Sequence, residues 1–338
     1  MAKSQKYLTE NIIRQDKFKK ILDKAYAKDR NWLIKKSKNF IKVSCPACGS
    51  KAKKRLFEKN RFKFKICLKC STAYISPRPP IKILKEFYNK SEGYKYWAKY
   101  TFKHSEKNRR KNLVNPRIKL INKYLKKYRI NKNLALEVGP GYGTYSEALK
   151  KEKIFKNVKV VEANKDLVKS CQEKKLDVIE DAFESIELKE KIDLLSSFEV
   201  IEHLFSPKSF LDKIHKNMSS RSLLYITCPN IHGFDNMVLG KASSTFDVEH
   251  LNYFTPQSIE ILLNKSKFKI LHLSTPGKLD VDLVAKYAEK NKNFLNKRSF
   301  FNQILFSKDK KLKEKFQSFL FDNCLSGHML VIAKKINI

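Results

Sequence analysis

Three glycines fall within five residues, in a chain of 338 residues that contains only 9 of them. They belong to the segment Glu137-Val138-Gly139-Pro140-Gly141-Tyr142-Gly143, which follows apolar residues and precedes a helix expected to open at Thr144. Glycine lets a backbone turn sharply and approach a ligand closely, and the N-terminus of the following helix would face that ligand. The segment therefore predicts a ligand-binding loop between a strand and a helix, with a purely structural turn as the alternative. Its spacing differs from the G-x-G-x-x-G pattern of dinucleotide sites, because residue 146 is serine.

Strand-like and helix-like segments alternate from residue 133 onward. The candidate strands are residues 134–138, 158–162, 176–179, 192–198, 222–228, 268–275 and 328–334. The candidate helices are residues 144–151, 165–174, 207–217, 257–264 and 280–322. Alternation of this kind predicts an α/β fold, with a doubly wound parallel sheet covered by helices on both faces.

Acidic residues stand beside the glycine loop and at the ends of the next two predicted strands. Glu137 precedes the first glycine, Glu162 ends the second strand, and Asp181 follows the third. The carboxyl ends of parallel strands form the edge at which such sheets bind ligands, and a carboxylate at the position of Glu162 is placed to hold a ribose diol.

In the order of these motifs the chain resembles the class I S-adenosylmethionine-dependent methyltransferases, over about residues 134–278 and 327–338. Residues 192–204 resemble the family's fourth strand and the turn after it, and residues 223–230 resemble its fifth strand. The resemblance implies a Rossmann-like methyltransferase sheet whose glycine loop wraps the amino-acid end of S-adenosylmethionine. It also implies that Glu162 binds the ribose hydroxyls and that Asp181 meets the adenine amine. The cofactor-binding residues expected in this way are Glu137, Gly139, Gly141, Gly143, Glu162, Asp181 and Phe198.

Two Cys-x-x-Cys pairs precede this region with the spacing C-x2-C-x18-C-x2-C. The four residues are Cys45, Cys48, Cys67 and Cys70. Four thiolates at this spacing predict a structural Zn²⁺ site in a zinc ribbon, which would be too small to fold without the ion. A redox-active cluster, or one that has lost its metal, is the alternative. Neither a secretory signal nor an apolar run long enough to span a membrane is found, so we expect a cytoplasmic protein and a reducing compartment, which favour metal over disulfides.

Two histidines lie where the acceptor of a methyl group would bind. His203 follows the predicted fourth strand, and His250 lies in the loop after the fifth. A hydroxyl or carbon acceptor must lose a proton, and histidine has a pKa suited to take it. The alternatives are loop histidines that position the backbone and, for His203, a role on the cofactor side.

The cluster Glu249-His250…Tyr253 resembles the base motif of zinc-containing sugar C-methyltransferases. That resemblance implies that His250 is the base and that Glu249 orients it. Those enzymes continue into a long C-terminal domain, whereas this sequence ends soon after its last predicted strand. The candidate catalytic residues are therefore His250, Glu249, Tyr253 and His203.

The charge is strongly positive and uneven. Residues 1–133 hold 40 basic and 8 acidic side chains of the 72 and 34 in the chain, whose net charge is +38. Such a field attracts polyanions such as RNA, an anionic membrane or a phosphorylated substrate, although an excess of lysine over arginine also results from coding bias.

We therefore expect methyl transfer to a hydroxyl or carbon of a small molecule, a sugar nucleotide or a surface-glycan precursor. The alternatives are an RNA methyltransferase that uses the basic ribbon region and a non-catalytic scaffold. Base-amine methyltransferases usually carry an Asp/Asn-Pro-Pro-aromatic turn after the fourth strand, and residues 197–200 lack it.

The expected organisation has four parts. A basic amphipathic helical segment (1–40) precedes the zinc ribbon (41–80). A helical linker or substrate-cap region (81–129) connects the ribbon to the methyltransferase domain (130–338). The domain contains a helical insertion (280–326) that we expect to cap the acceptor site or to mediate self-association.

Overall fold

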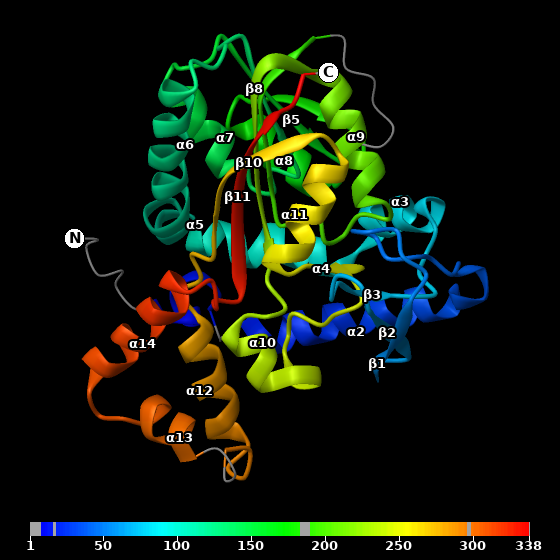
Figure 1. Cartoon of the computed structure of the whole chain (residues 1–338), viewed down its shortest axis with the longest axis vertical. Helices are drawn as coiled ribbons and strands as arrows, with labels where there is room; N and C mark the ends of the chain where they lie inside the picture. The colour runs from blue at the N-terminus through cyan, green and yellow to red at the C-terminus, as the bar shows by residue number, and fades with distance from the viewer. Residues whose placement is uncertain (1–7, 16–17, 183–189, 296–298, 338) are drawn as a thin grey trace.

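The computed structural model describes residues 8–15, 18–182, 190–295 and 299–337, and its main feature is a seven-stranded sheet (Figure 1). The strand order is β10-β11-β8-β7-β4-β5-β6. The strands are β4 (Leu134–Val138), β5 (Asn157–Glu162), β6 (Asp177–Glu180), β7 (Ile192–Phe198), β8 (Met218–Pro229), β10 (Phe268–Ser274) and β11 (His328–Lys335). Neighbouring strands from β8 to β6 are parallel, whereas β11 is antiparallel to both β8 and β10. The expected α/β fold is confirmed.

Helices cover both faces of this sheet because successive residues of a strand point to opposite sides. Leu134, Leu136 and Val138 of β4 face one apolar cluster, which includes residues of α9 (Pro207–Asn217) and α11 (Pro256–Lys265). Ala135 faces the opposite cluster, which is formed with α6 (Asn115–Lys127) and α7 (Thr144–Lys151). A smaller cluster joins α8 (Lys165–Glu173) to β5.

The N-terminal helices are part of the same body. They are α1 (Glu10–Ile13), α2 (Lys19–Lys35), α3 (Ile81–Lys90), α4 (Glu92–Tyr96) and α5 (Lys103–Arg109), with π-helical turns at Trp97–Phe102 and Arg110–Val114. The buried carboxylate of Asp29 in α2 accepts hydrogen bonds from the backbone N–H groups of Glu92 (2.9 Å) and Gly93 (2.8 Å). It thereby satisfies donors that the first turn of α4 leaves free.

Four further helices form a separate apolar cluster. They are α10 (Phe234–Leu239), α12 (Asp280–Lys290), α13 (Ser299–Leu305) and α14 (Lys310–Asp322), and α12–α14 occupy the expected insertion. Figure 1 shows them beyond the end of the sheet at which β11 begins. The register pairs His328 at the start of β11 with Pro229 at the end of β8, so this is the carboxyl end of the parallel strands.

A second, antiparallel sheet has the order β1-β2-β3-β9. Its strands are β1 (Lys53–Lys59), β2 (Phe62–Cys67), β3 (Ala73–Ile75) and β9 (Asn252–Tyr253). The first cysteine pair precedes β1, and the second pair lies at the end of β2 and in the turn before β3. The last strand comes from the segment between β8 and α11, and it pairs Tyr253 with Ala73 and Asn252 with Tyr74. The ribbon region therefore holds the loop that contains His250.

Arg78 secures this junction. Its side chain is fully buried, and its three nitrogen atoms donate to the carbonyl oxygens of Ile75 (2.9 Å), Phe205 (3.1 Å) and Leu251 (3.1 Å) and to Oδ1 of Asn252 (2.9 Å). One planar guanidinium thus joins β3, β9 and the loop after β7, which a single ammonium could not do.

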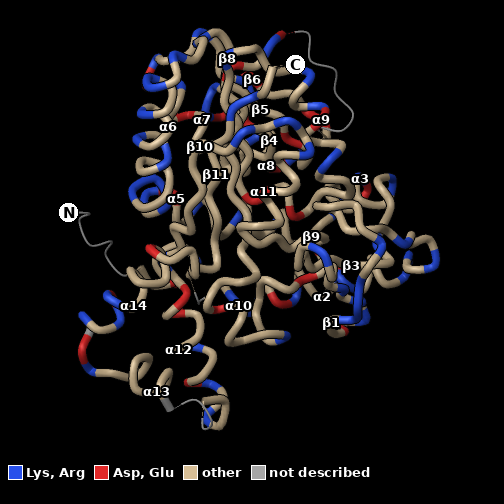
Figure 2. Tube along the Cα trace, in the orientation of Figure 1, with Lys and Arg blue, Asp and Glu red and all other residues tan. Residues whose placement is uncertain are grey.

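The basic residues are distributed over the small sheet, the N-terminal helices and α6 (Figure 2). No helix of the described residues is both long and apolar enough to cross a membrane.

Replacing Arg78 by Met should lower the free energy of unfolding by about 4 kcal/mol. Four buried oxygen atoms would lose their donor, and each unpaired group costs about 1–3 kcal/mol. Urea unfolding would measure the change, with Lys82→Met, at an exposed position of α3, as the matched control. A loss below about 1 kcal/mol would contradict the assignment of Arg78 as the link between the two sheets.

Candidate functional site

The glycine loop lies between β4 and α7, against the segment that follows β7. Gly139 has a φ of +69°, and a Cβ atom there would stand 2.5 Å from Cγ2 of Val200. Only glycine fits, both because of this φ and because the side chain of Val200 occupies the space. The loop therefore packs against Val200, which lies three residues before His203.

Two buried carboxyl groups stand beside the loop. Glu137 is 4% exposed, and Oε2 accepts a hydrogen bond of 2.5 Å from the hydroxyl of Ser146. Glu162 is 8% exposed, and Oε1 accepts one of 2.9 Å from the N–H of Asn164. Burial raises the pKa of each carboxyl to about 7. Buried carboxylates of this kind are poised to accept hydrogen bonds from donors of a ligand.

The other two expected cofactor residues differ in exposure. Phe198, at the end of β7, packs edge to face against Tyr145 at 4.7 Å and Tyr225 at 5.1 Å between ring centroids. Asp181 is exposed, and one residue separates it from residues 183–189, which lie outside the described part of the chain. Its Oδ1 accepts a hydrogen bond of 2.6 Å from the N–H of Ala182.

The imidazoles of His203 and His250 lie against each other, with 4.6 Å between ring centroids. Nδ1 of His203 is 3.0 Å from the carbonyl oxygen of Glu249, and Nδ1 of His250 is 2.8 Å from that of Thr245. Because a carbonyl oxygen only accepts, each Nδ1 carries the proton and each Nε2 keeps its lone pair. Burial lowers both pKa values, that of His203 to about 3, so both rings are neutral at pH 7.

The surroundings of His250 include the ring of Tyr253, whose centroid lies 6.1 Å from that of the imidazole, and a backbone carbonyl. Nδ1 of His250 contacts the carbonyl of Thr245, and the part of Glu249 that contacts a histidine is its carbonyl, toward His203. Tyr253 lies in an aromatic cluster with Phe64 and Phe246, and its hydroxyl donates to the carbonyl of Asp247 at 2.8 Å. Both residues thus shape the loop that carries His250.

Glu202 is a residue of this site that the sequence reasoning missed. It is 1% exposed, and neither carboxylate oxygen has a hydrogen-bond partner among the described residues. One of its oxygens lies within 4.8 Å of ligand atoms of both His203 and His250. Its position directly before His203 in the sequence could have indicated that it belongs to this site.

Three arginines lie close enough to one another to interact through space. Arg14 stacks on Trp97, Arg109 on Phe102 and Arg117 on Phe198, at 5.3, 5.0 and 4.2 Å from the ring centroids. Burial lowers the pKa of Arg109 to about 9, and repulsion from Arg14 and Arg117 contributes to the shift. The negative charge of Glu199 acts in the opposite direction and raises this pKa. Such a concentration of guanidinium groups favours an anion.

The aspartates at the start of α12 are engaged within the protein. Asp280 accepts hydrogen bonds from Nε2 of Gln317 (2.8 Å) and from the N–H of Gly327. Asp282 accepts one of 2.8 Å from the N–H of Glu10. Their contacts hold the last helices to the body of the molecule.

The four cysteines come together as the spacing predicts. Sγ of Cys45 is 3.4 Å from that of Cys70, Sγ of Cys48 is 3.5 Å from that of Cys67, and all four lie within 4.8 Å of one another. Tetrahedral zinc with bonds of about 2.3 Å separates its sulfurs by about 3.8 Å, so the cluster is compatible with Zn²⁺.

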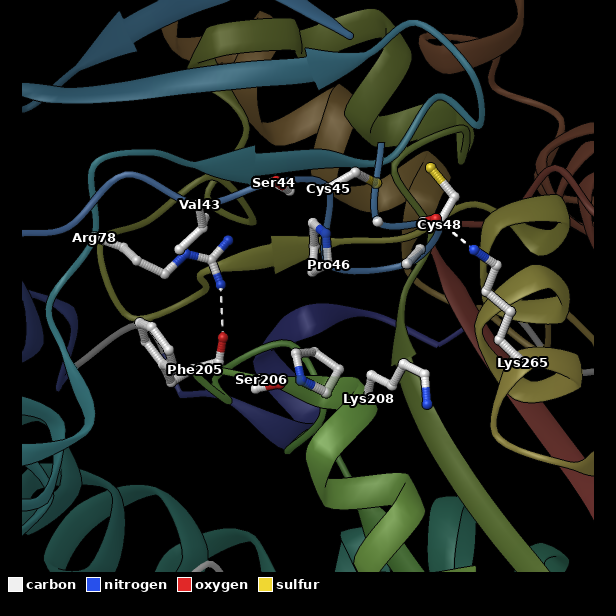
Figure 3. Close-up of a pocket in the computed structure, with 13 residues that line it drawn as sticks. Val43, Ser44, Cys45, Pro46, Cys48, Arg78, Phe205, Ser206, Lys208 and Lys265 are labelled. Carbon is white, nitrogen blue, oxygen red and sulfur yellow. Dashed lines mark hydrogen bonds between the residues drawn. The ribbon is translucent and has the colours of Figure 1, made fainter. Parts of the chain in front are cut away.

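A cavity of about 390 Å³ lies between the first cysteine pair and the loop after β7 (Figure 3). Lys265 borders it and donates a hydrogen bond of 2.5 Å to the carbonyl of Cys48. Arg78 reaches Phe205 across it. The cysteine cluster is thus joined to α11 and to the turn that carries His203.

Comparisons with known proteins found one family model and several solved structures that are similar to this chain. Residues 107–273 match the family model described as a methyltransferase domain. An S-adenosylmethionine-dependent methyltransferase from Clostridium acetobutylicum is similar in structure at 12% identity, covering 64% of this chain and 89% of that one, with a TM-score of 0.44. A chain from the complex of the Haloferax volcanii Trm112 methyltransferase activator with a methyltransferase is similar at 12% identity, covering 72% and 98%, with a TM-score of 0.49.

No curated protein matches the chain. The family match covers the glycine loop, both buried carboxyl groups and the histidine pair. Together with the sheet, it supports a methyltransferase domain with a Rossmann-like fold.

Proposed function

We propose that this protein transfers a methyl group from S-adenosylmethionine to a hydroxyl or carbon of a small, phosphorylated molecule, with a sugar nucleotide or surface-glycan precursor as the substrate class. The observation that carries the proposal is the histidine pair. Two neutral imidazoles, each with an Nε2 atom that has no hydrogen-bond partner among the described residues, lie close to Val200, against which the glycine loop packs. Nitrogen acceptors already carry a lone pair, whereas hydroxyl and carbon acceptors need a group that helps to remove a proton.

The cofactor supplies the methyl group as a sulfonium, and the protein supplies its orientation. We assign the ribose hydroxyls to Glu162 and the amino-acid end to the glycine loop and Glu137. Phe198 and the aromatic residues behind it form an apolar wall at the end of β7. Methyl transfer is an in-line displacement, so much of its rate comes from holding donor and acceptor in line.

The arginine group supports the phosphorylated acceptor. Arg109 and Arg117 have no carboxylate within salt-bridge distance among the described residues, and Arg117 lies over the ring of Phe198. Guanidinium groups suit phosphate because their donors form a planar fork. We propose that they bind the phosphate of the acceptor, which orients the atom to be methylated toward the histidine pair.

We propose that the four cysteines hold one structural Zn²⁺. The ion would fix β2 and β3, and β3 in turn holds β9 through its pairing with Asn252 and Tyr253. The metal would therefore act on the acceptor side indirectly, through the position of the loop that carries His250.

Purified protein should contain about one zinc per chain, and Cys67→Ser should lose it. Loss of the ion should also loosen the junction of the two sheets, because the N–H of Ile75 donates to the carbonyl of Leu251. Elemental analysis and hydrogen exchange at Ile75 would measure both effects. Cys324→Ser, outside the cluster, is the control. A zinc content unchanged in Cys67→Ser would contradict the assignment.

The affinity for S-adenosylhomocysteine should rise by up to about tenfold between pH 6 and pH 8. The pKa of Glu162 is about 7 in the unliganded protein, so the carboxylate that accepts the ribose hydroxyls is present mainly above that pH. Glu162→Gln should bind more weakly and depend less on pH, while Glu173→Gln, at an exposed position of α8, should behave as the wild type. Calorimetric titration at several pH values measures this. Affinity independent of pH in the wild type would count against the role of Glu162.

Tritium from methyl-labelled S-adenosylmethionine should pass to a member of a nucleotide-sugar panel. His250→Ala should reduce turnover by about 10²–10⁴-fold with little change in S-adenosylhomocysteine affinity, and His232→Ala should change neither. Transfer of label to RNA instead would contradict the sugar-nucleotide substrate class and favour an RNA methyltransferase. Full turnover by His250→Ala would remove the histidine pair from the mechanism.

A further inference from the structure

We propose that Glu202, His203 and His250 together bind one divalent first-row transition-metal ion on the acceptor side of the site. The binding itself does not depend on the proposed methyl transfer. The use of the ion on an acceptor hydroxyl, described below, rests on that proposed function.

The geometry of the three side chains fits a single ion. One ligand atom from each lies within 4.8 Å of the others. Bonds of about 2.0–2.2 Å to nitrogen and oxygen bring ligand atoms about 3–4 Å apart, so a small closure completes the set. Two imidazoles and one carboxylate are typical ligands of Mn²⁺, Fe²⁺, Co²⁺ and Zn²⁺.

The two histidines are already oriented as metal ligands. The carbonyls of Glu249 and Thr245 accept the Nδ1 protons, which fixes the orientation of both rings and leaves the lone pair of each Nε2 available to a metal ion. Metal-binding histidines commonly donate their second N–H to a carbonyl in this way, and the contact fixes the tautomer and the ring orientation.

Glu202 supplies an independent reason to expect a cation. Its carboxylate is almost fully buried, and both oxygens lack a partner in the described structure. A buried carboxylate without hydrogen bonds or a counterion is costly. The neighbouring Glu199 cannot stabilise the carboxylate of Glu202, because Glu199 is itself acidic. Glu199 accepts a hydrogen bond of 2.8 Å from the hydroxyl of Thr227 and lies 3.5 Å from Nδ1 of His328. A metal ion would satisfy Glu202 directly.

The ligands come from two parts of the chain that the fold joins. Glu202 and His203 lie in the turn after β7, while His250 precedes β9. The N–H groups of Leu251 (2.8 Å) and Asn252 (2.9 Å) donate to the carbonyl of Glu202, so the two segments are bonded directly beside the ligand set.

A bound ion would change how the acceptor loses its proton. A hydroxyl coordinated to a divalent ion is more acidic, and the ion stabilises the resulting oxyanion. With the ion present both Nε2 atoms would be coordinated, so the proton of the bound hydroxyl would pass to solvent water. Without it, an imidazole is available to accept that proton.

Mn²⁺ is the probe for the experiment, because it prefers oxygen and nitrogen ligands to the four thiolates of the cysteine cluster. The full chain, with the zinc of the cysteine cluster retained, is dialysed against metal-free buffer and titrated with Mn²⁺, and free Mn²⁺ is followed by electron paramagnetic resonance. We expect one saturable site per chain and a rise in melting temperature. Glu202→Gln and His250→Ala should weaken binding at least about tenfold, and Asp212→Asn, an exposed carboxylate on α9, should not.

Two further measurements separate the outcomes. Circular dichroism and S-adenosylhomocysteine binding show whether each variant is folded. No saturable Mn²⁺ binding, or equal binding in folded Glu202→Gln, overturns the metal site and leaves methyl transfer untouched. Mn²⁺ binding with no binding of S-adenosylhomocysteine retains the metal site and overturns the proposed function.

Discussion

The short pairing of β3 with β9, together with the guanidinium of Arg78, determines how the two halves of the site meet. The parallel sheet fixes the glycine loop, Glu162 and His203, because these residues end its strands or follow them. His250 belongs to a long segment between β8 and α11, and two residues of that segment pair with the small sheet. The cysteine cluster and Arg78 therefore position a side chain that the large sheet does not reach by itself.

Burial sets the chemistry of the site more than the net charge does. The chain carries +38, yet Glu137, Glu162 and Glu202 are buried acids, and the histidine pair is neutral. Most lysines lie on the outside, where water and salt screen them. Arg14, Arg109 and Arg117 are the exception, because aromatic rings hold these three guanidinium groups in place, and Arg117 lies over Phe198 at the end of β7.

Local patterns predicted the large sheet well, because its strands contain short apolar runs, such as residues 134–136 of β4 and 223–226 of β8. Residues 134–138 form β4, residues 192–198 form β7, and the glycine loop separates β4 from α7 as expected. The cysteine spacing likewise brought four sulfurs together. The strands and the glycine loop depend on residues that are near in sequence. The cysteine cluster depends on a tetrahedral ligand geometry that only a few cysteine spacings satisfy.

Other features depend on contacts between distant segments and have no local signature. The two residues of β9 are too few to show a strand period, and nothing in the sequence pairs them with residues 73–74. The partner of Nδ1 in His250 is the backbone carbonyl of Thr245, which residue identity does not reveal. Glu202 differs from a surface glutamate only because the fold buries it without a partner.

A crystal structure of the protein with S-adenosylhomocysteine is the most direct test of the relation between cofactor and acceptor side. We predict that the homocysteine lies in the Gly139–Gly143 loop, that the ribose hydroxyls contact Glu162, and that the sulfur opens toward the space shared by His203 and His250. A ligand bound with its sulfur facing away from the histidine pair, or bound elsewhere in the molecule, would contradict the arrangement on which the proposed chemistry depends.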